Sequence, residues 1–425
     1  MTIAGTVQVH KSLPAWRRLA RVGVVTSIAA TAVLLTACGG GDQVKKFKPT
    51  KIVSFGDENS ALVEVNVGGN GTVTTIKGFK YGVNDIGIAK VGADPSGLTV
   101  ASTQTAWIDF PAVGSAVSNT LAGSLTATSS YYQVVQDFNL TTLYTNSSSG
   151  TQPVTYTYTY YCASNRLWNQ ILANSYGLGY KTQCPSETYS GAVTYAENAA
   201  TVTSTATQVS AHRGELDSNT LVTVMAGQND VLNAYAEIRA GTLTLDSAKS
   251  RMTAQGAALA AIVNDVIKTG ARVLVVKLPD LGVSPLGIAD PALPDGSSAA
   301  TNLAALVLAF NNGILNTITN DGTKIGLVNF YDYTRYIHDS PTNYGFTEMV
   351  SSVCQTTSVY KPDGTATSGA RTAPLYGGDA LLYCNSYTIT NSASTYFWSD
   401  EVHLSPGAHA YLGSLAYSRA DDNPF

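Results

Sequence analysis

The chain has 425 residues, enough for one large domain or two ordinary ones. Only 13% of the residues are charged and 44% are hydrophobic, a composition that is unusual for a cytoplasmic protein and fits an exported one. The formal net charge of −4 leaves no basic excess, which argues against nucleic acid as a partner.

The N-terminus is typical of a bacterial export signal. Four basic residues between Lys11 and Arg21 precede an apolar run, 22–35, which is too short for a spanning helix. The run ends in Leu35-Thr36-Ala37-Cys38, which resembles the lipobox of bacterial lipoproteins. We therefore expect a signal peptide over 1–37, a lipid-modified Cys38 and a flexible tether over 38–50. An ordinary signal peptide with an incidental cysteine is the alternative.

This interpretation has consequences for location and charge. Gly39 after the cysteine resembles outer-membrane sorting, so we expect a domain that the lipid anchor holds on the periplasmic or surface face of that membrane. Cleavage before Cys38 removes four of the 25 Lys and Arg residues, which leaves 21 against 29 Asp and Glu. The sequence does not indicate an oligomeric state.

A short apolar strand is predicted over 51–56, followed by the polar turn Asp57-Glu58-Asn59-Ser60. Residues 65–160 are rich in Gly, Thr, Ser and Tyr and have no helical period. Their alternation at 155–160 has the period of a strand, so we expect a β-rich or irregular insertion there.

From residue 165 onward, helical patterns alternate with short apolar runs. Such an alternation predicts a three-layer α/β/α sandwich with a central parallel sheet. The predicted strands cover 221–225, 273–278 and 325–330. One predicted helix follows residue 165, and a second ends at about 209. Three more cover 245–269, 302–319 and 408–417. Residues 339–395 are expected to be mostly loop.

Four cysteines remain in the exported domain: Cys162, Cys184, Cys354 and Cys384. An even number in an exported protein indicates two disulfides, and three pairings are possible. We favour Cys162–Cys184 and Cys354–Cys384, because each closes a local loop. A zinc site is the rival, but no CxxC or HxxxH spacing supports it, so no metal and no cofactor are expected.

Two stretches carry groups suited to hydrolysis. In Asp400-x-x-His403, a tight turn can place the carboxylate under one imidazole nitrogen and leave the other free to exchange a proton. In Gly227-Gln228-Asn229-Asp230, the glycine lets the backbone approach closely, and the Asn229 amide can donate to an oxyanion. Alone, each is more often a structural turn than a site.

Together these stretches resemble the SGNH hydrolases, also called the GDSL esterase/lipase family, in its lipase-like branch. Phe55-Gly56-Asp57 looks like the family's first block, Gly227-x-Asn229-Asp230 the third and Asp400-x-x-His403 the fifth. The resemblance covers about residues 51–60 and 165–417. It implies hydrolysis of carboxylic esters without metal, with His403 as general base, Asp400 as its orienting acid and Asn229 as an oxyanion donor, supported by Gly227 and Asp57.

Two positions depart from the family pattern. Glu58 stands where the family has its nucleophilic serine, and the next serine is Ser60. Asn198 stands where an oxyanion glycine is expected in the second block, and asparagine tolerates the left-handed backbone better than most residues.

Three accounts of the site remain open. In the first, a wider loop brings the Ser60 hydroxyl to His403, since two residues along a helix would turn it by about 200°. In the second, Glu58 acts as general base on water and holds His403 as a cation. In the third, the cleft is chemically inactive and binds a glycan or lipid. The leading expectation is ester hydrolysis of an acyl or acetyl group, on a small-molecule, glycan or lipid ester, through Ser60, His403, Asp400 and Asn229.

Overall fold

The computed structural model describes residues 46–69, 72–91, 103–109, 116–124, 130–134, 137–146, 150–293, 295–354, 381–382, 384, 389 and 391–421. The predicted signal peptide, Cys38 and most of the tether lie outside these residues. The last residues of the tether contact the domain. Lys46 pairs with Asp421 at 2.5 Å, and the Arg272 guanidinium lies 4.1 Å from the Phe47 ring centroid. No helix within the described ranges is long and apolar enough to cross a membrane.

The centre of the domain is a five-stranded sheet in which every neighbouring pair is parallel. Its order is β10-β1-β11-β12-β13. The chain starts in the interior of the sheet, adds a strand on one side and then moves to the other, so the order reverses at β1 and β11. Ligands of such sheets bind at this reversal, beyond the carboxyl ends of the strands. The strands are β1 (Lys51–Gly56), β10 (Ala192–Thr194), β11 (Thr220–Met225), β12 (Arg272–Val276) and β13 (Ile325–Val328).

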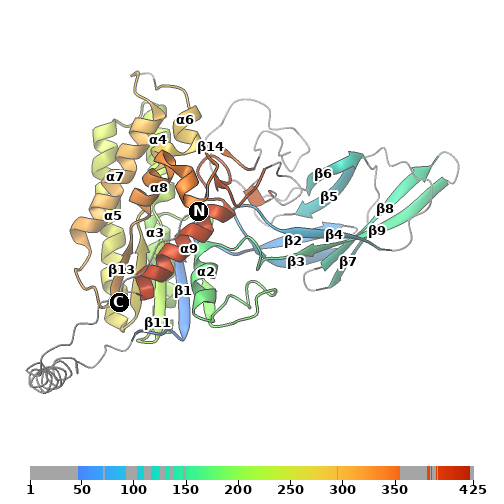
Figure 1. The fold of residues 1–425 in the computed structure, drawn as a ribbon, viewed down its shortest axis with the longest axis horizontal. Coiled ribbons are helices and arrows are strands. Elements are labelled where there is room, and N and C mark those ends of the chain that lie inside the picture. Colours follow the sequence, from blue (N-terminus) through green and yellow to red (C-terminus); the bar gives the residue numbers. More distant parts are fainter. Residues whose placement is uncertain are drawn as a thin grey trace, which may run out of the picture. The chain divides into compact units, whose positions relative to one another are not determined.

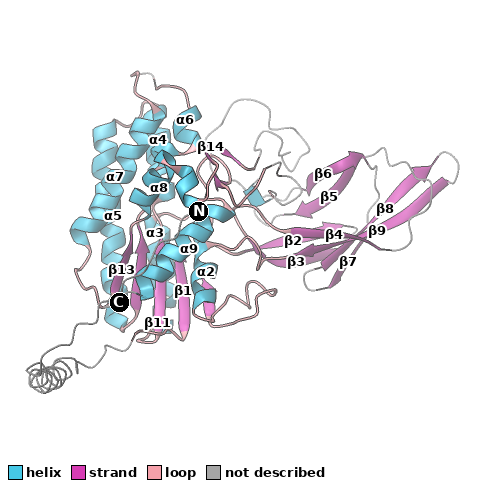
Figure 2. Ribbon diagram, viewed as in Figure 1, coloured by secondary structure: helices cyan, strands magenta, loops and turns pink. Residues whose placement is uncertain are grey.

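Helices cover both sides of this sheet (Figures 1 and 2). Helices α5 and α7 pack along each other and against α4, and α2 packs against α9. The sheet is apolar because both of its faces are buried, and all six residues of β11 are buried. These features confirm the predicted fold class. The main helices are α2 (Trp168–Ser175), α3 (Val202–His212), α4 (Gln228–Arg239), α5 (Leu245–Val266), α6 (Pro285–Ala289), α7 (Ala299–Thr317), α8 (Phe330–Asp339) and α9 (Pro406–Asp421).

Several boundaries differ from the predictions, among them the ends of β12, α7 and α9. The strand predicted to run to residue 330 ends at Val328, and Phe330 instead begins α8. Residues 339–395 are not all loop, because β14 (Glu348–Ser352) pairs in parallel with β15 (Tyr396–Trp398). Short 3-10 helices cover Glu58–Ser60, Arg213–Glu215, Ile267–Thr269, Leu281–Val283 and Pro341–Tyr344.

The insertion after β1 is built from strands, as predicted. It contains two four-stranded sheets, ordered β3-β2-β5-β6 and β4-β9-β8-β7, whose pairs are antiparallel. Phe79 and Tyr160 are buried and stack with their ring centroids 4.2 Å apart. The strands are β2 (Val63–Gly69), β3 (Thr72–Phe79), β4 (Ile86–Val91), β5 (Thr103–Asp109), β6 (Ala116–Ser124), β7 (Ser130–Val134), β8 (Asp137–Asn146) and β9 (Gly150–Tyr160).

Both predicted disulfides are present. Cys162 is bonded to Cys184 and Cys354 to Cys384, with Cα atoms 5.6 and 5.8 Å apart. Each bond closes a short loop, of 22 and 30 residues of sequence separation. The first loop contains α2, and the second follows β14.

Candidate active site

The turn after β1 is fixed by backbone contacts that only glycine permits. Gly56 has a φ of 134°, and a Cβ at this position would lie 1.8 Å from the carbonyl oxygen of Met225 at the end of β11. The side-chain amide of Gln208 pairs with both backbone groups of Gly56, at 2.9 and 3.0 Å. Asp57 then caps the short 3-10 helix by accepting from the Asn59 N–H at 3.1 Å. The tight turn therefore aims residue 58 beyond the carboxyl end of the sheet.

Groups from three separate segments of the chain converge on the Glu58 carboxylate. The His403 Nε2 lies 3.2 Å from Glu58 Oε1. The backbone N–H of Ala199 donates to Oε2 at 3.0 Å, and the Asn229 amide donates to Oε2 at 2.9 Å and to Oε1 at 3.2 Å. Ala199 follows β10 and Asn229 lies in the first turn of α4, so the donors come from the strand ends on either side of β1.

His403 and Asp400 form the pair that the sequence spacing predicts. Asp400 Oδ2 lies 2.8 Å from His403 Nδ1, while Oδ1 accepts from the backbone N–H groups of Val402 and His403 at 2.9 and 2.7 Å. These bonds hold both residues in the loop between β15 and α9. Because Asp400 occupies Nδ1, the Nε2 atom faces Glu58. His403 therefore lies between two carboxylates.

This arrangement holds His403 as a cation at neutral pH. Burial by itself disfavours its charge, but Asp400 and then Glu58 outweigh burial and raise the pKa of His403 to about 10. In return, the histidine outweighs the burial of Asp400 and lowers the pKa of that carboxyl. In its resting form the imidazole can donate a proton but cannot accept one.

Asp57 lies directly behind Glu58 and is fully buried. Burial, followed by the neighbouring charge of Glu58, raises the pKa of Asp57 well above its usual range. Its Oδ1 accepts from the backbone and side-chain N–H groups of Asn59, both at 3.1 Å. Asp57 thus shapes the turn through its contacts with Asn59.

The structure argues against Ser60 as the nucleophile. The side chain has no exposed surface, and its Oγ accepts from the indole N–H of Trp168 at 3.1 Å. The Ser60 carbonyl accepts from Asn169 at 3.0 Å and from the Thr194 hydroxyl at 2.8 Å. The turn does not widen as the first account required, because the 3-10 helix begins at Glu58 itself. Ser60 consequently points toward α2, and Glu58 holds the place beside His403.

The second block also departs from the prediction. Asn198 was expected to adopt the left-handed backbone of the missing glycine, but the positive φ, 55°, belongs to Ala199. The Asn198 side chain is exposed, and the backbone N–H that reaches the site is that of Ala199. Sequence reasoning missed Ala199, although placing the expected glycine of the second block one residue later than Asn198 would have found it.

Gly227 positions the third block as expected. It is the N-cap residue of α4, with a φ of 111°, and a Cβ here would lie 2.1 Å from Cζ of Phe310. The glycine therefore lets α4 start directly beneath α7. This start places Asn229 over Glu58, with its amide also held by the Ala200 carbonyl at 3.1 Å.

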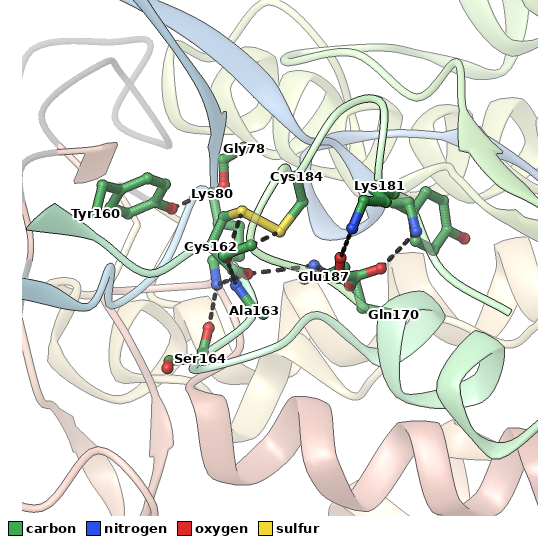
Figure 3. Close-up of a disulfide and its surroundings, with 12 residues drawn as sticks. Gly78, Lys80, Tyr160, Cys162, Ala163, Ser164, Gln170, Lys181, Cys184 and Glu187 are labelled. Atoms are coloured by element: carbon green, nitrogen blue, oxygen red, sulfur yellow. Dashed lines mark hydrogen bonds between the residues drawn. A yellow bond between two sulfur atoms is a disulfide. The ribbon is translucent and has the colours of Figure 1, made fainter. Parts of the chain in front are cut away.

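The disulfide Cys162–Cys184 supports the site through α2 (Figure 3). The buried Lys80 ammonium donates to the carbonyls of Cys162, Ser164 and Asn165 at 3.1, 2.5 and 3.0 Å, which fixes the chain that leads into the helix. Gln170 on α2 donates to Glu187 at 2.8 Å. Since α2 carries the indole that holds Ser60, this cluster determines which way the turn faces. The sequence predicted the disulfide of this cluster, but no motif indicated Lys80, Gln170 or Glu187.

A cavity of about 540 Å³ lies beside the turn. Gln208, which holds Gly56, lines it together with Glu197 from the loop that leads to Ala199. Tyr195 and His212 stack at its wall with ring centroids 3.3 Å apart. Glu58 does not line this cavity and is only 2% exposed, whereas Ala199 is exposed and Asn229 partly so.

No group of three or more His, Cys, Asp or Glu residues in the described part of the chain is arranged to hold a metal ion. The described site brings together one imidazolium, its orienting carboxylate, a second carboxylate and two N–H donors.

Residues 118–416 match the family model described as GDSL-like lipase/acylhydrolase. Among curated proteins, none matches this sequence. Solved structures that resemble the chain include the acetyl xylan esterase AlAXEase, with 11% identity, a TM-score of 0.30, and coverage of 58% of this chain and 87% of that one. Another is the YxiM protein of Bacillus subtilis, with 10% identity, a TM-score of 0.28, and coverage of 84% and 87%. These two scores are too low to support an inference.

Proposed function

The chain belongs to the GDSL-like lipase/acylhydrolase family, whose general activity is ester hydrolysis, and we propose that it hydrolyses esters at Glu58, His403 and Asp400 rather than at a serine. The contact between Glu58 Oε1 and His403 Nε2, at 3.2 Å, carries this proposal. It places a carboxylate where a serine hydroxyl would meet its base.

Each residue then has a role that follows from its contacts. His403 begins as a cation and donates its Nε2 proton to the departing alcohol, while Asp400 fixes its ring and stabilises its charge. The Asn229 amide and the Ala199 N–H stabilise negative charge at Glu58 Oε2. Because the resting His403 is an acid, the reaction starts with proton donation and not with removal of a proton from a nucleophile.

We also propose that the substrate is an acyl or acetyl ester on a glycan or lipid. The cavity beside the turn, at about 540 Å³, supports this class because it is lined by both aromatic and polar side chains. The lipobox around Cys38 supports a lipid-anchored domain at the outer membrane.

A second candidate is a non-catalytic binding protein. The observation that favours it is that Glu58 already satisfies the donors of the site, and that Glu58 and His403 are 2% and 0% exposed. A site closed in this way would hold its own anion permanently. The cleft would then bind a glycan or lipid without reaction.

Hydrolysis of p-nitrophenyl acetate and butyrate by the purified chain tests these candidates. We expect turnover above the uncatalysed rate, and a loss of roughly 100-fold or more in Glu58→Gln and His403→Gln. Ser60→Ala is the matched control, because it alters the same turn without touching His403, and it should retain turnover within about three-fold. Thermal unfolding of each variant excludes loss of fold as the cause.

The outcomes separate the accounts. Loss of activity in Ser60→Ala but not in Glu58→Gln would restore serine as the nucleophile. Absence of turnover in the wild-type chain, with turnover gained in Glu58→Ser, would show a site converted to binding.

A further inference from the structure

The two N–H donors of the site, those of Ala199 and Asn229, contact a carboxyl group of the protein itself, that of Glu58. Both the Ala199 N–H and the Asn229 amide reach Glu58 Oε2, at 3.0 and 2.9 Å. The other oxygen, Oε1, faces the His403 Nε2 at 3.2 Å and receives a longer contact from Asn229, also at 3.2 Å. The two oxygens of one carboxylate therefore have different surroundings.

This asymmetry has a chemical consequence. Fixed donors stabilise most strongly the species in which the oxygen that they contact carries a full negative charge. Oε2 carries such a charge when Cδ of Glu58 becomes tetrahedral, with water added to an acylated Glu58. Oε1, on the side of the proton donor, is then the oxygen available to form the bond to the acyl group.

We propose, building on the function proposed above, that Glu58 is a covalent nucleophile and that its own carboxyl carbon is the centre hydrolysed in the second step. In the first step, Oε1 attacks the acyl carbon of the ester, the bond from that carbon to the alkoxy oxygen breaks, and His403 gives its Nε2 proton to the departing alcohol. The products are the free alcohol, a mixed anhydride on Glu58 and a neutral His403.

The second step restores the site. His403 Nε2 takes a proton from water as the hydroxide adds to Cδ of Glu58, and Oε2 bears the resulting charge against Ala199 and Asn229. The bond between Cδ and Oε1 then breaks, and the acyl group leaves as a carboxylate that carries Oε1. Glu58 retains one oxygen from water and releases its proton to solvent, while His403 is again a cation.

The position of the reacting groups agrees with this sequence. Loss of the Glu58 charge in the first step removes one of the two carboxylates that hold His403 protonated, so the histidine becomes a better base when a base is needed. Ala199, whose N–H contacts Oε2, is exposed, while His403 is fully buried.

A single-turnover experiment in H₂¹⁸O tests the proposal. The full chain, in molar excess over p-nitrophenyl acetate, is quenched after one turnover and digested, and the peptide containing Glu58 is analysed by mass spectrometry. We expect one ¹⁸O atom at Glu58 and unlabelled oxygen in the acetate released by the first turnover. Glu58→Gln is the matched control and should neither turn over nor take up label.

The possible results are distinct. Turnover with an unlabelled Glu58 and one ¹⁸O in the acetate would overturn the proposal that the Glu58 carboxyl carbon is the centre hydrolysed, because water then attacked the acyl carbon, and would leave Glu58-dependent ester hydrolysis standing. No turnover in the wild-type chain would overturn both proposals. Label at Glu58 without added ester would show exchange unrelated to turnover, and would also count against the covalent step.

Discussion

Lys80 and His403 make the free energy of unfolding depend on pH in opposite directions. Replacing either residue should therefore expose the pH dependence that the other one causes. Both side chains are buried, with 1% and 0% of their surface exposed. Burial lowers the pKa of Lys80 to about 7, although the carboxylates of Asp85 and Glu187 oppose the shift. The pKa of His403 is raised to about 10, because Asp400 and Glu58 outweigh its burial.

The signs follow from proton linkage. His403 holds a proton in the folded chain that it loses in the unfolded chain, so its stabilisation is fully present below a pH of about 6.5 and is lost as the pH rises through about 10. Lys80 behaves in the opposite way. Its buried charge destabilises the fold below a pH of about 7, and the penalty is relieved as the pH rises toward 10.5, the ordinary pKa of a lysine side chain.

The two effects cancel in the wild-type chain between about pH 7.5 and 9. Each contributes a slope near 1.4 kcal/mol per pH unit, with opposite signs. Lys80→Met keeps the apolar stem and removes the titrating amine. As the pH rises through this window, the free energy of unfolding of Lys80→Met should therefore fall by about 2 kcal/mol, whereas that of the wild-type chain stays nearly constant. In His403→Gln it should rise by a similar amount.

Urea unfolding followed by tryptophan fluorescence, with both disulfides intact, measures these differences. The change across the pH window is compared between variants, so the hydrogen bonds lost in Lys80→Met shift the whole curve without altering its slope. A Lys80→Met curve parallel to that of wild type would refute the reasoning. It would mean that the three carbonyls that accept from the ammonium keep Lys80 charged in the fold.

Four further results are expected. Ser60→Ala should lower the free energy of unfolding by about 1 kcal/mol, the cost of the lost indole hydrogen bond, in urea unfolding at neutral pH. Gly227→Ala should lower it by roughly 2–5 kcal/mol, because a Cβ with φ of 111° would overlap Phe310, and a cost below that of an ordinary surface change would contradict this contact. Replacing Cys162 and Cys184 together by serine should cost about 2–4 kcal/mol in the same assay. Turnover should be faster with p-nitrophenyl acetate than with ethyl acetate, because a carboxylate nucleophile is expelled more easily than an alkoxide. Equal rates would show that acyl transfer to Glu58 does not limit turnover.

The fold could be predicted because its central elements follow simple patterns. Parallel strands that are buried on both faces are apolar throughout, and the long helices show a period of 3.6 residues. Some of the missed elements directly follow a strand or are very short. Helix α8 is rich in tyrosine and other polar residues and follows β13 after a single residue, Asn329, so its first residue looked like the end of the strand. Strand β10 has only three residues.

The sequence could predict only the part of the site whose residues lie close together along the chain. Asp400 and His403 are three residues apart, and their turn brings them together without help from the rest of the chain. The choice between Glu58 and Ser60 depends on contacts between distant segments. Trp168, which holds Ser60, is 108 residues away in the sequence, and its helix is positioned by a disulfide and a buried lysine.

Glu58 satisfies the donors that converge on the turn after β1. A buried imidazolium and two N–H donors aimed at one point destabilise a fold unless an acceptor satisfies them. The Glu58 carboxylate reaches all three, at 2.9 to 3.2 Å, so it keeps the donors of Ala199, Asn229 and His403 satisfied without substrate. A shorter side chain at this position would leave the donors open for an ester carbonyl, and it would remove the second carboxylate from His403. In the mechanism proposed above, the same residue would both stabilise the resting site and determine which carbonyl carbon the donors act on.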